Sequence, residues 1–208
     1  MEDNVQIALP GMRLRLPGQL ALPPDSDMVV AFAHGSGSGR NSPRNQYVAE
    51  ALNEAGLGTL LFDLLTTEES ADRLNVFNIQ LLAYRLDLVT DWLREQAPDL
   101  RVGYFGASTG AAAALQAAGE RHTDIATVVS RGGRPDLAAE WLGRVRAPTL
   151  LIVGGDDPEV VELNGAALRR LENAEAHLEI VPGATHLFEE PGALESVAAL
   201  ARAWFTTH

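Results

Sequence analysis

Short apolar runs alternate along this chain with longer stretches in which apolar residues recur at helical spacing. Such alternation is typical of a parallel sheet covered by helices on both faces. The predicted strands are Met28–Ala33, Gly58–Phe62, Val102–Phe105, Ile125–Val129, Thr149–Val153 and His177–Val181. The predicted helices are Pro43–Ala55, Ile79–Glu95, Ala111–Glu120, Val160–Leu171 and Ala193–Phe205, separated in places by Pro98, Pro148 and Pro182. The pattern therefore predicts a doubly wound, mostly parallel α/β fold.

The N-terminal segment has a different pattern from the rest of the chain. Two shorter alternating runs, Val5–Leu9 and Met12–Leu16, lie on either side of Pro10-Gly11. Alternation around a Pro-Gly turn predicts an antiparallel hairpin, which we expect to extend one edge of the sheet. Because no repeat, low-complexity tract or linker interrupts the chain, we expect a single domain over residues 1–208.

The composition is that of a globular protein, with 46% hydrophobic and 21% charged residues among 208. A formal net charge of −12 argues against nucleic acid or an anionic membrane surface as a partner, because either would require a basic face. The N-terminus, Met1-Glu2-Asp3-Asn4, is acidic where a signal peptide is basic. No apolar stretch approaches the ~20 residues of a membrane span. We therefore expect a cytoplasmic protein.

Two residue types are missing from the chain. It contains no cysteine, and all 16 of its basic residues are arginine. These absences exclude a cysteine nucleophile, a thiolate zinc site, a Schiff-base lysine and a P-loop lysine. Catalysis by a serine hydroxyl remains available.

One serine lies between a predicted strand and a predicted helix. Val102–Phe105 is followed by Gly106-Ala107-Ser108-Thr109-Gly110 and then by a run of alanines. A Gly-x-Ser-x-Gly pattern can arise by chance in a chain with 19 glycines, but the order strand, turn, helix is that of a nucleophile elbow. In such a turn the serine is strained and its hydroxyl stands clear of the sheet. Ser108 is therefore the candidate nucleophile.

The loop after the first buried strand reads His34-Gly35-Ser36-Gly37-Ser38-Gly39. Its glycines let backbone N–H groups approach a developing oxyanion, and the N–H groups of Ser36 and Thr109 would form a two-donor hole. We expect the histidine of this loop to order it rather than to catalyse. The competing interpretation is a dinucleotide phosphate loop, with Asp63 at the end of the next strand. Against it, Arg40 stands where that motif requires its last glycine.

Two carboxylates and a histidine follow the last two predicted strands. Asp156 and Asp157 lie in the turn Gly154-Gly155-Asp156-Asp157-Pro158, and His186 ends the segment Pro182-Gly183-Ala184-Thr185-His186. Serine, acid and histidine in this chain order match one known order of the catalytic triad. From the residues alone, either aspartate can supply the acid. The other histidines in the second half of the chain are expected at the surface or at its end: His122, His177 and His208.

Two arginines, Arg131 and Arg134, follow the strand predicted next to the elbow strand. With Arg40 and Arg44 after the oxyanion loop, they could surround the pocket and favour an ester that carries a carboxylate. The competing interpretation is that they are solvated or paired with nearby acids such as Asp136.

Together these motifs resemble the α/β-hydrolase superfamily, in its dienelactone-hydrolase-like branch of small serine hydrolases without a cap. The resemblance extends from about Met28 to Phe205 and rests on residues 34–39, 103–110, 154–157 and 183–186. It implies a serine-dependent hydrolase without metal or organic cofactor, and its Gly-x-x-Asp turn selects Asp157 as the acid. Dienelactone hydrolases proper use a cysteine nucleophile, so their substrate does not carry over to a chain with Ser108.

The expected reaction is acyl transfer from a small ester or lactone to water. Ser108 attacks the carbonyl carbon, His186 carries the proton to the leaving alcohol, and Asp157 holds the imidazole. Because no long insertion separates Val129 from Thr149, we expect no cap domain and a shallow, open pocket. Thioester or amide cleavage and transfer to another acceptor remain open for the same triad. So does a non-catalytic binding module, because fold does not fix function.

Overall fold

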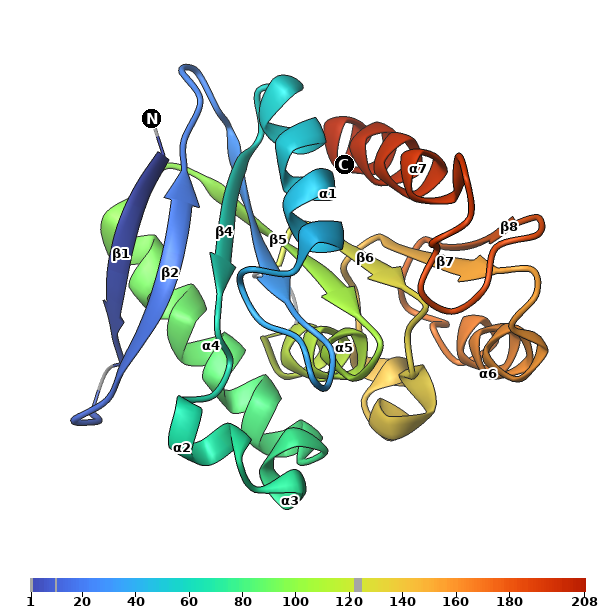
Figure 1. Cartoon of the computed structure of the whole chain (residues 1–208), viewed down its shortest axis with the longest axis horizontal. Helices are drawn as coiled ribbons and strands as arrows, with labels where there is room; N and C mark the ends of the chain where they lie inside the picture. The colour runs from blue at the N-terminus through green and yellow to red at the C-terminus, as the bar shows by residue number, and fades with distance from the viewer. Residues whose placement is uncertain (1, 10, 122–124) are drawn as a thin grey trace.

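The structure is a computed structural model and describes residues 2–9, 11–121 and 125–208. Within these residues, eight strands form one sheet in the order β1-β2-β4-β3-β5-β6-β7-β8 (Figure 1). The strands are β1 (Glu2–Ala8), β2 (Arg15–Ala21), β3 (Met28–Ala33), β4 (Gly58–Phe62), β5 (Arg101–Ala107), β6 (Val128–Arg131), β7 (Thr149–Gly154) and β8 (Ala176–Val181). β2 pairs antiparallel with β1 and β4, and all other neighbours are parallel. The predicted mostly parallel α/β sheet is confirmed.

The central strands are the ones that the sequence identifies most clearly. Every residue of β3, β4 and β7 is buried, because helices cover both faces of the sheet there. β8 lies at the edge, and only its last residue, Val181, is buried. Continuous apolar runs therefore correspond to the strands that are covered on both faces.

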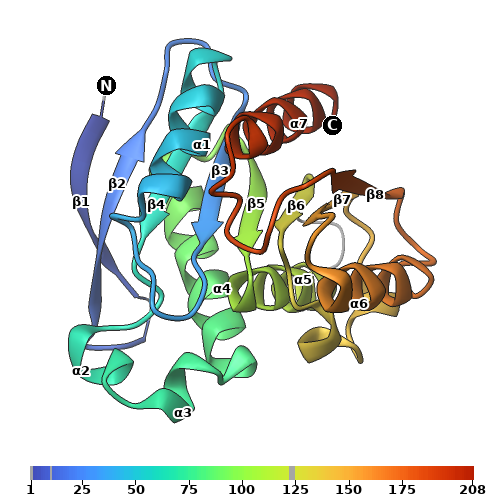
Figure 2. The ribbon, with the colours of Figure 1, turned by 45° about the vertical axis from the view of Figure 1, so that its right-hand side comes forward.

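Helices cover both faces of the sheet (Figure 2). α1 (Pro43–Glu54) and α7 (Ala193–Thr207) lie side by side on one face, where they pack on Phe32 and Phe105. α4 (Ile79–Gln96), α5 (Thr109–Arg121) and α6 (Pro158–Leu168) cover the other face. Between β6 and β7 the described chain has only two 3-10 helices, η1 (Pro135–Ala138) and η2 (Leu142–Arg144), and no separate cap domain.

The N-terminal hairpin lies at the predicted edge, but its second strand was placed too early. β2 runs from Arg15 to Ala21 and pairs Ile7 with Leu16. Pro17-Gly18 looks like a strand breaker in the sequence, yet Gly18 pairs with Phe62 of β4. An alternating pattern locates a strand, whereas its pairing partners decide where it begins and ends. Pro10, in the predicted turn, lies outside the described residues.

Two further boundaries differ from the prediction. β6 begins at Val128 rather than at Ile125, because it follows the register of β5, and Ser130 and Arg131 belong to the strand instead of to a loop. The segment after β4, left unassigned by the sequence, forms two short helices, α2 (Thr67–Ser70) and α3 (Arg73–Val76). α2 begins with a capping box between Thr66 and Glu69.

Candidate active site

Ser108 lies on the turn between β5 and α5. Its φ of 51° is in the left-handed region, which non-glycine residues rarely adopt. A Cβ on Gly106 would overlap the backbone of Ala111, and a Cβ on Gly110 would overlap the carbonyl oxygen of Ala33. The two glycines therefore let α5 start directly against β5 and β3. This is the strained strand–turn–helix geometry of a nucleophile elbow, with the positive end of α5 at the serine.

Asp157 and His186 are in contact. His186 Nδ1 lies 2.7 Å from Asp157 Oδ2, and the two side chains are 38% and 17% exposed. Their loops are joined by backbone bonds, since the N–H of Asp156 donates to Ala184 O at 2.9 Å. Asp156 itself is exposed. Asp157 stands at the N-cap of α6 but makes no capping hydrogen bond, because its carboxylate turns toward the histidine.

The serine and the histidine meet at the same end of the sheet. The N–H of Ser108 donates to Arg131 O at 3.2 Å, and the next residue, Gly132, packs against His186. A Cβ on Gly132 would lie 3.6 Å from His186 Cε1. Among the described residues, neither Ser108 Oγ nor His186 Nε2 makes a hydrogen bond.

His34 orders the glycine-rich loop, as the sequence predicts. Its Nε2 accepts a hydrogen bond from the backbone N–H of Leu64 at 3.0 Å, so Nδ1 carries the proton and donates to Gly35 O at 3.0 Å. Burial lowers the pKa of the imidazole, against the opposing effects of the Gly35 carbonyl and of Asp63. His34 therefore serves as a neutral bridge between the loop and the end of β4.

The predicted oxyanion donors lie on adjacent segments. A Cβ on Gly35 would come within 3.1 Å of Ser108 Cβ, so the loop passes directly over the serine. The N–H of Ser36 donates to the side-chain hydroxyl of Thr109 at 3.0 Å. One of the two predicted donors is therefore engaged by a side chain of the protein itself.

Asp63 braces the same loop from the end of β4. Its Oδ1 accepts the backbone N–H of Arg40 at 2.7 Å, and its Oδ2 pairs with the Arg40 guanidinium. The carboxylate that a dinucleotide site would offer to a ribose is thus engaged by the protein itself. We find no support for the dinucleotide interpretation.

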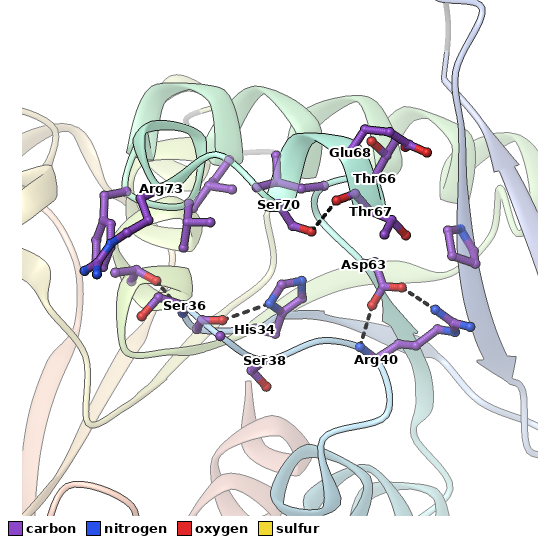
Figure 3. Close-up of a pocket in the computed structure, with 18 of the residues that line it drawn as sticks. His34, Ser36, Ser38, Arg40, Asp63, Thr66, Thr67, Glu68, Ser70 and Arg73 are labelled. Carbon is purple, nitrogen blue, oxygen red and sulfur yellow. Dashed lines mark hydrogen bonds and ion pairs between the residues drawn. The ribbon is translucent and has the colours of Figure 1, made fainter.

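A cavity of ≈ 950 Å³ opens beside the glycine-rich loop (Figure 3). Ser36 and Thr109 line it, whereas Ser108 and His186 are not among its described lining residues. Much of the remaining lining comes from α2, α3 and their flanking residues: Leu65, Thr66, Thr67, Glu68, Ser70, Arg73, Val76 and Phe77. This volume is at the upper end for small-molecule pockets.

A buried ion pair supports the α2 wall of this cavity. Arg85 of α4 is only 3% exposed, and its guanidinium lies 2.5 Å from the carboxylate of Glu69. Glu69 also completes the capping box of α2. The wall is therefore held to the body of the protein by Glu69, the residue that also completes the capping box of α2.

The arginines predicted near the site have different environments. Arg134 forms a two-pronged ion pair with Asp136, at 2.8 and 2.7 Å, so its guanidinium is occupied. Arg44 contacts Glu189 at 3.1 Å. Arg131 is 8% exposed and makes no ion pair with a described residue. Burial, with a smaller contribution from Arg44, lowers the pKa of Arg131 to about 10.

Several supporting residues have no evident signal in the sequence. Glu190 accepts hydrogen bonds from the N–H and hydroxyl of Thr185 at 3.0 and 2.6 Å, which fixes the residue before His186 and lowers the pKa of the Glu190 carboxyl. Phe188, at φ 55°, is a second strained residue close to the histidine. Asn164 of α6 donates to Gly133 O at 3.0 Å. The contact between Asn164 and Gly133 joins segments that are distant in sequence.

Neither a metal site nor a membrane-spanning helix is found among the described residues. No group of three or more histidine, cysteine, aspartate or glutamate side chains is arranged to hold a metal ion in the ranges 2–9, 11–121 and 125–208. Over the same ranges no helix has both the length and the apolar character needed to cross a membrane. His122, predicted at the surface, lies outside the described residues.

No protein-family model matches the chain. Curated sequences from two strains of Mycobacterium tuberculosis, provisionally named phosphoribosyl transferases, are 60% identical over 194 residues. The match covers 92% of this chain but only 43% of those proteins, so the chain spans less than half the length of these relatives.

Solved structures match over the whole chain. The crystal structure of a dienelactone hydrolase from Anabaena variabilis has a TM-score of 0.95 and 52% identity, and covers 100% of this chain and 98% of its own. An α/β serine hydrolase homologue from Coxiella burnetii has a TM-score of 0.80 at 21% identity, with 97% and 96% covered. An esterase domain from Rhodothermus marinus has a TM-score of 0.78 at 18% identity, with 98% and 97% covered. The last two establish likeness of fold.

Proposed function

The chain belongs to the α/β-hydrolase superfamily, in its dienelactone-hydrolase-like branch, and from that premise we propose that it is a serine hydrolase of small esters or lactones. The observation that carries the proposal is the strained Ser108 at the end of β5, with the His186–Asp157 pair on neighbouring loops. A backbone strained at one serine is costly, and such strain concentrates at functional sites. The 52% identity to a dienelactone hydrolase supports the same reaction class.

In the proposed reaction, Ser108 Oγ attacks the ester carbonyl carbon while its proton passes to His186 Nε2. The carbonyl oxygen becomes the oxyanion. When the tetrahedral intermediate collapses, the proton moves from Nε2 to the leaving alcohol and an acyl-enzyme remains on Ser108. Water then attacks the acyl carbon by the same route, and free acid and enzyme result. Asp157, 2.7 Å from Nδ1, fixes the tautomer and stabilises the imidazolium.

The oxyanion would be held by the N–H groups of Ser36 and Thr109. The Ser36 N–H already has an acceptor in Thr109 Oγ1. An oxyanion is a stronger acceptor than a neutral hydroxyl, so we infer that the Ser36 N–H exchanges the threonine hydroxyl for the substrate oxygen as charge develops. In this sequence of events the Thr109 side chain holds the loop in place until the substrate arrives.

The cavity beside the loop supports a substrate of modest size. At ≈ 950 Å³, with hydroxyl groups from Ser36, Ser38, Thr67 and Ser70 among its lining, it suits a polar acyl or alcohol group better than a long lipid chain. Thioester or amide bonds remain alternatives for the same site. Esters, thioesters and amides that share one acyl group would rank them by kcat/KM.

The transferase name of the mycobacterial relatives belongs to proteins more than twice as long as the match. The match covers 92% of this chain, in which the strained serine and the histidine–aspartate pair lie. We infer that any phosphoribosyl transfer resides in the part of those proteins outside the match. The chain alone is then expected to hydrolyse esters and to transfer no phosphoribosyl group.

Covalent labelling with a fluorophosphonate tests the proposal without a known substrate. We expect wild-type protein to be labelled at Ser108, identified by peptide mapping, and Ser108→Ala to lose both the label and esterase activity while it stays folded. Ser196→Ala, in α7 and exposed, is the matched control and should be labelled like wild type. Undiminished labelling or activity of Ser108→Ala would reject the proposal.

A further inference from the structure

Arg131 is a buried cation without an anion. It is 8% exposed, its Nη1 is buried without a hydrogen-bond acceptor, and no carboxylate of a described residue forms an ion pair with it. The protein has 28 acidic residues, and most of the other arginines near the site are paired. Burying a charge without a partner costs several kcal/mol, so such a group is rare unless a ligand completes it.

The position of Arg131 connects it to the candidate active site. It is the last residue of β6, its carbonyl oxygen accepts the N–H of Ser108, and the following Gly132 packs against His186. Its guanidinium carbon lies 5.9 Å from the centre of the Phe105 ring. The ring offers the cation some stabilisation but no hydrogen-bond acceptor for its N–H groups.

A second arginine lies close to it. Arg44, in the first turn of α1, is near enough to lower the pKa of Arg131, and its own Nε is buried without an acceptor. The first turn of α1 contains no acidic residue, and Ser42 at the N-cap makes no side-chain cap. A guanidinium with an unpartnered Nε therefore lies at the positive end of a 12-residue helix and acts electrostatically on Arg131.

One exposed carboxylate, that of Glu189, forms an ion pair with Arg44. Glu189 contacts Arg44 at 3.1 Å, and its side chain is 64% exposed. Exposed ion pairs of this kind contribute little and open easily. Glu189 thus occupies Arg44 in the unliganded protein and can be displaced by an anion that also satisfies Arg131.

We propose that Arg131 and Arg44 form an anion-binding subsite beside His186, and that it takes a carboxylate or phosphate group carried by the substrate itself. The planar fork of a guanidinium matches the oxygens of either group. Arg40 and Arg134 take no part, since Asp63 and Asp136 occupy them. The assignment to the substrate, rather than to a free anion, rests on the proposed hydrolase function.

Thermal denaturation of the Ser108→Ala variant tests the subsite without turnover. Inorganic phosphate or acetate, compared with chloride at equal ionic strength, is expected to raise Tm by a few degrees. Adding Arg131→Met should abolish the rise, whereas adding Arg101→Met, an exposed arginine at the opposite end of β5, should preserve it. An equal rise with and without Arg131 would overturn the subsite.

The stability of Arg131→Met separates a ligand-binding role from a structural one. Methionine fills a similar volume without a charge, so the variant should unfold at the same temperature as wild type or higher when no anion is present. A lower Tm would mean that the arginine holds the fold, and would overturn the proposal. Glu189→Gln is the second variant. It frees Arg44 and should give the same Tm rise at a lower phosphate concentration, and the absence of that change would also count against the subsite.

A matched pair of esters tests the assignment to the substrate. Wild type should hydrolyse ethyl hydrogen succinate with a higher kcat/KM than ethyl butyrate, and Arg131→Met should reduce that preference by roughly 10- to 100-fold. A wild-type preference for the neutral ester would overturn the assignment. If the fluorophosphonate does not label Ser108 while phosphate still raises Tm through Arg131, the hydrolase proposal fails and the anion site stands.

Discussion

The backbone N–H of Ser36 donates a hydrogen bond to the side-chain hydroxyl of Thr109, 73 residues away in the sequence. The contact joins the glycine-rich loop after β3 to the first residue of α5. Both residues are candidate donors to an oxyanion, so this hydrogen bond holds the two candidate donors close together. The side chain of Thr109 therefore has a role that its position in the elbow motif does not reveal.

Thr109→Val should reduce kcat roughly tenfold, since a hydrogen bond of ~1.4 kcal/mol that anchors the loop is lost. Thr109→Ser keeps the hydroxyl and should restore most of the rate. Steady-state kinetics on one ester, with circular dichroism as a check of folding, measure both. A higher kcat in Thr109→Val would mean instead that the hydroxyl competes with the oxyanion for the Ser36 N–H.

Substitution of the two neighbouring aspartates, Asp156 and Asp157, should have very different effects on kcat. Asp157→Asn should lower kcat by several orders of magnitude, because an amide at Nδ1 no longer favours the productive tautomer of His186. Asp156→Asn should change kcat less than about threefold, as its side chain is exposed and only its backbone N–H contacts the histidine loop. Comparable losses in the two variants would show that either carboxylate can serve the histidine.

Two glycines in helices should respond to alanine in opposite directions. Gly110→Ala should destabilise the protein by roughly 2 kcal/mol or more, because the new Cβ overlaps the backbone of β3. Gly165→Ala, in the interior of α6 with nothing within 4 Å of its Cβ, should stabilise it by roughly 0.5–1 kcal/mol. Urea unfolding measures both. A small change in the free energy of unfolding of Gly110→Ala would mean that α5 and β3 approach less closely than the structure indicates.

Because the His34 imidazole is buried and neutral, the free energy of unfolding of the protein should depend on pH. The pKa of this imidazole is lowered by burial, so below about pH 6.5 the unfolded chain binds a proton that the folded protein does not. The contribution of His34 is therefore fully present above that pH and is lost as pH falls, by at most ~1.4 kcal/mol per unit. The stability difference between wild type and His34→Gln should narrow from pH 7.5 to pH 5.5.

Unfolding free energies of wild type and His34→Gln at the two pH values provide the test. A difference for His34→Gln that stays constant or widens on acidification would contradict a neutral imidazole at this position.

Much of the fold follows from local patterns. β3, β4 and β7 are apolar because both faces of the sheet are covered there, so their runs are visible without any knowledge of their partners. The strand–turn–helix order around Ser108 is also local, since the two glycines and the alanine run lie within one short segment. The sheet and the elbow were therefore predictable.

The ends of the edge strands and the structure of the irregular segments were not predictable from the sequence. Alternation placed the second strand of the hairpin too early, because its ends depend on pairing with β1 and β4. The segment that forms α2 and α3 has little apolar periodicity. This segment forms one wall of the cavity, and its position depends on the ion pair between Glu69 and Arg85, which lie on different helices.

The sequence by itself determined the fold class and the residue types available for chemistry at the ends of the strands. Only the tertiary structure decided which of those residues have partners. Arg134 is paired with Asp136, whereas Arg131 is buried without a carboxylate, although both follow the elbow strand in the same sheet. Charge pairing depends on distances of a few ångströms across separate elements, and a one-dimensional pattern does not carry those distances.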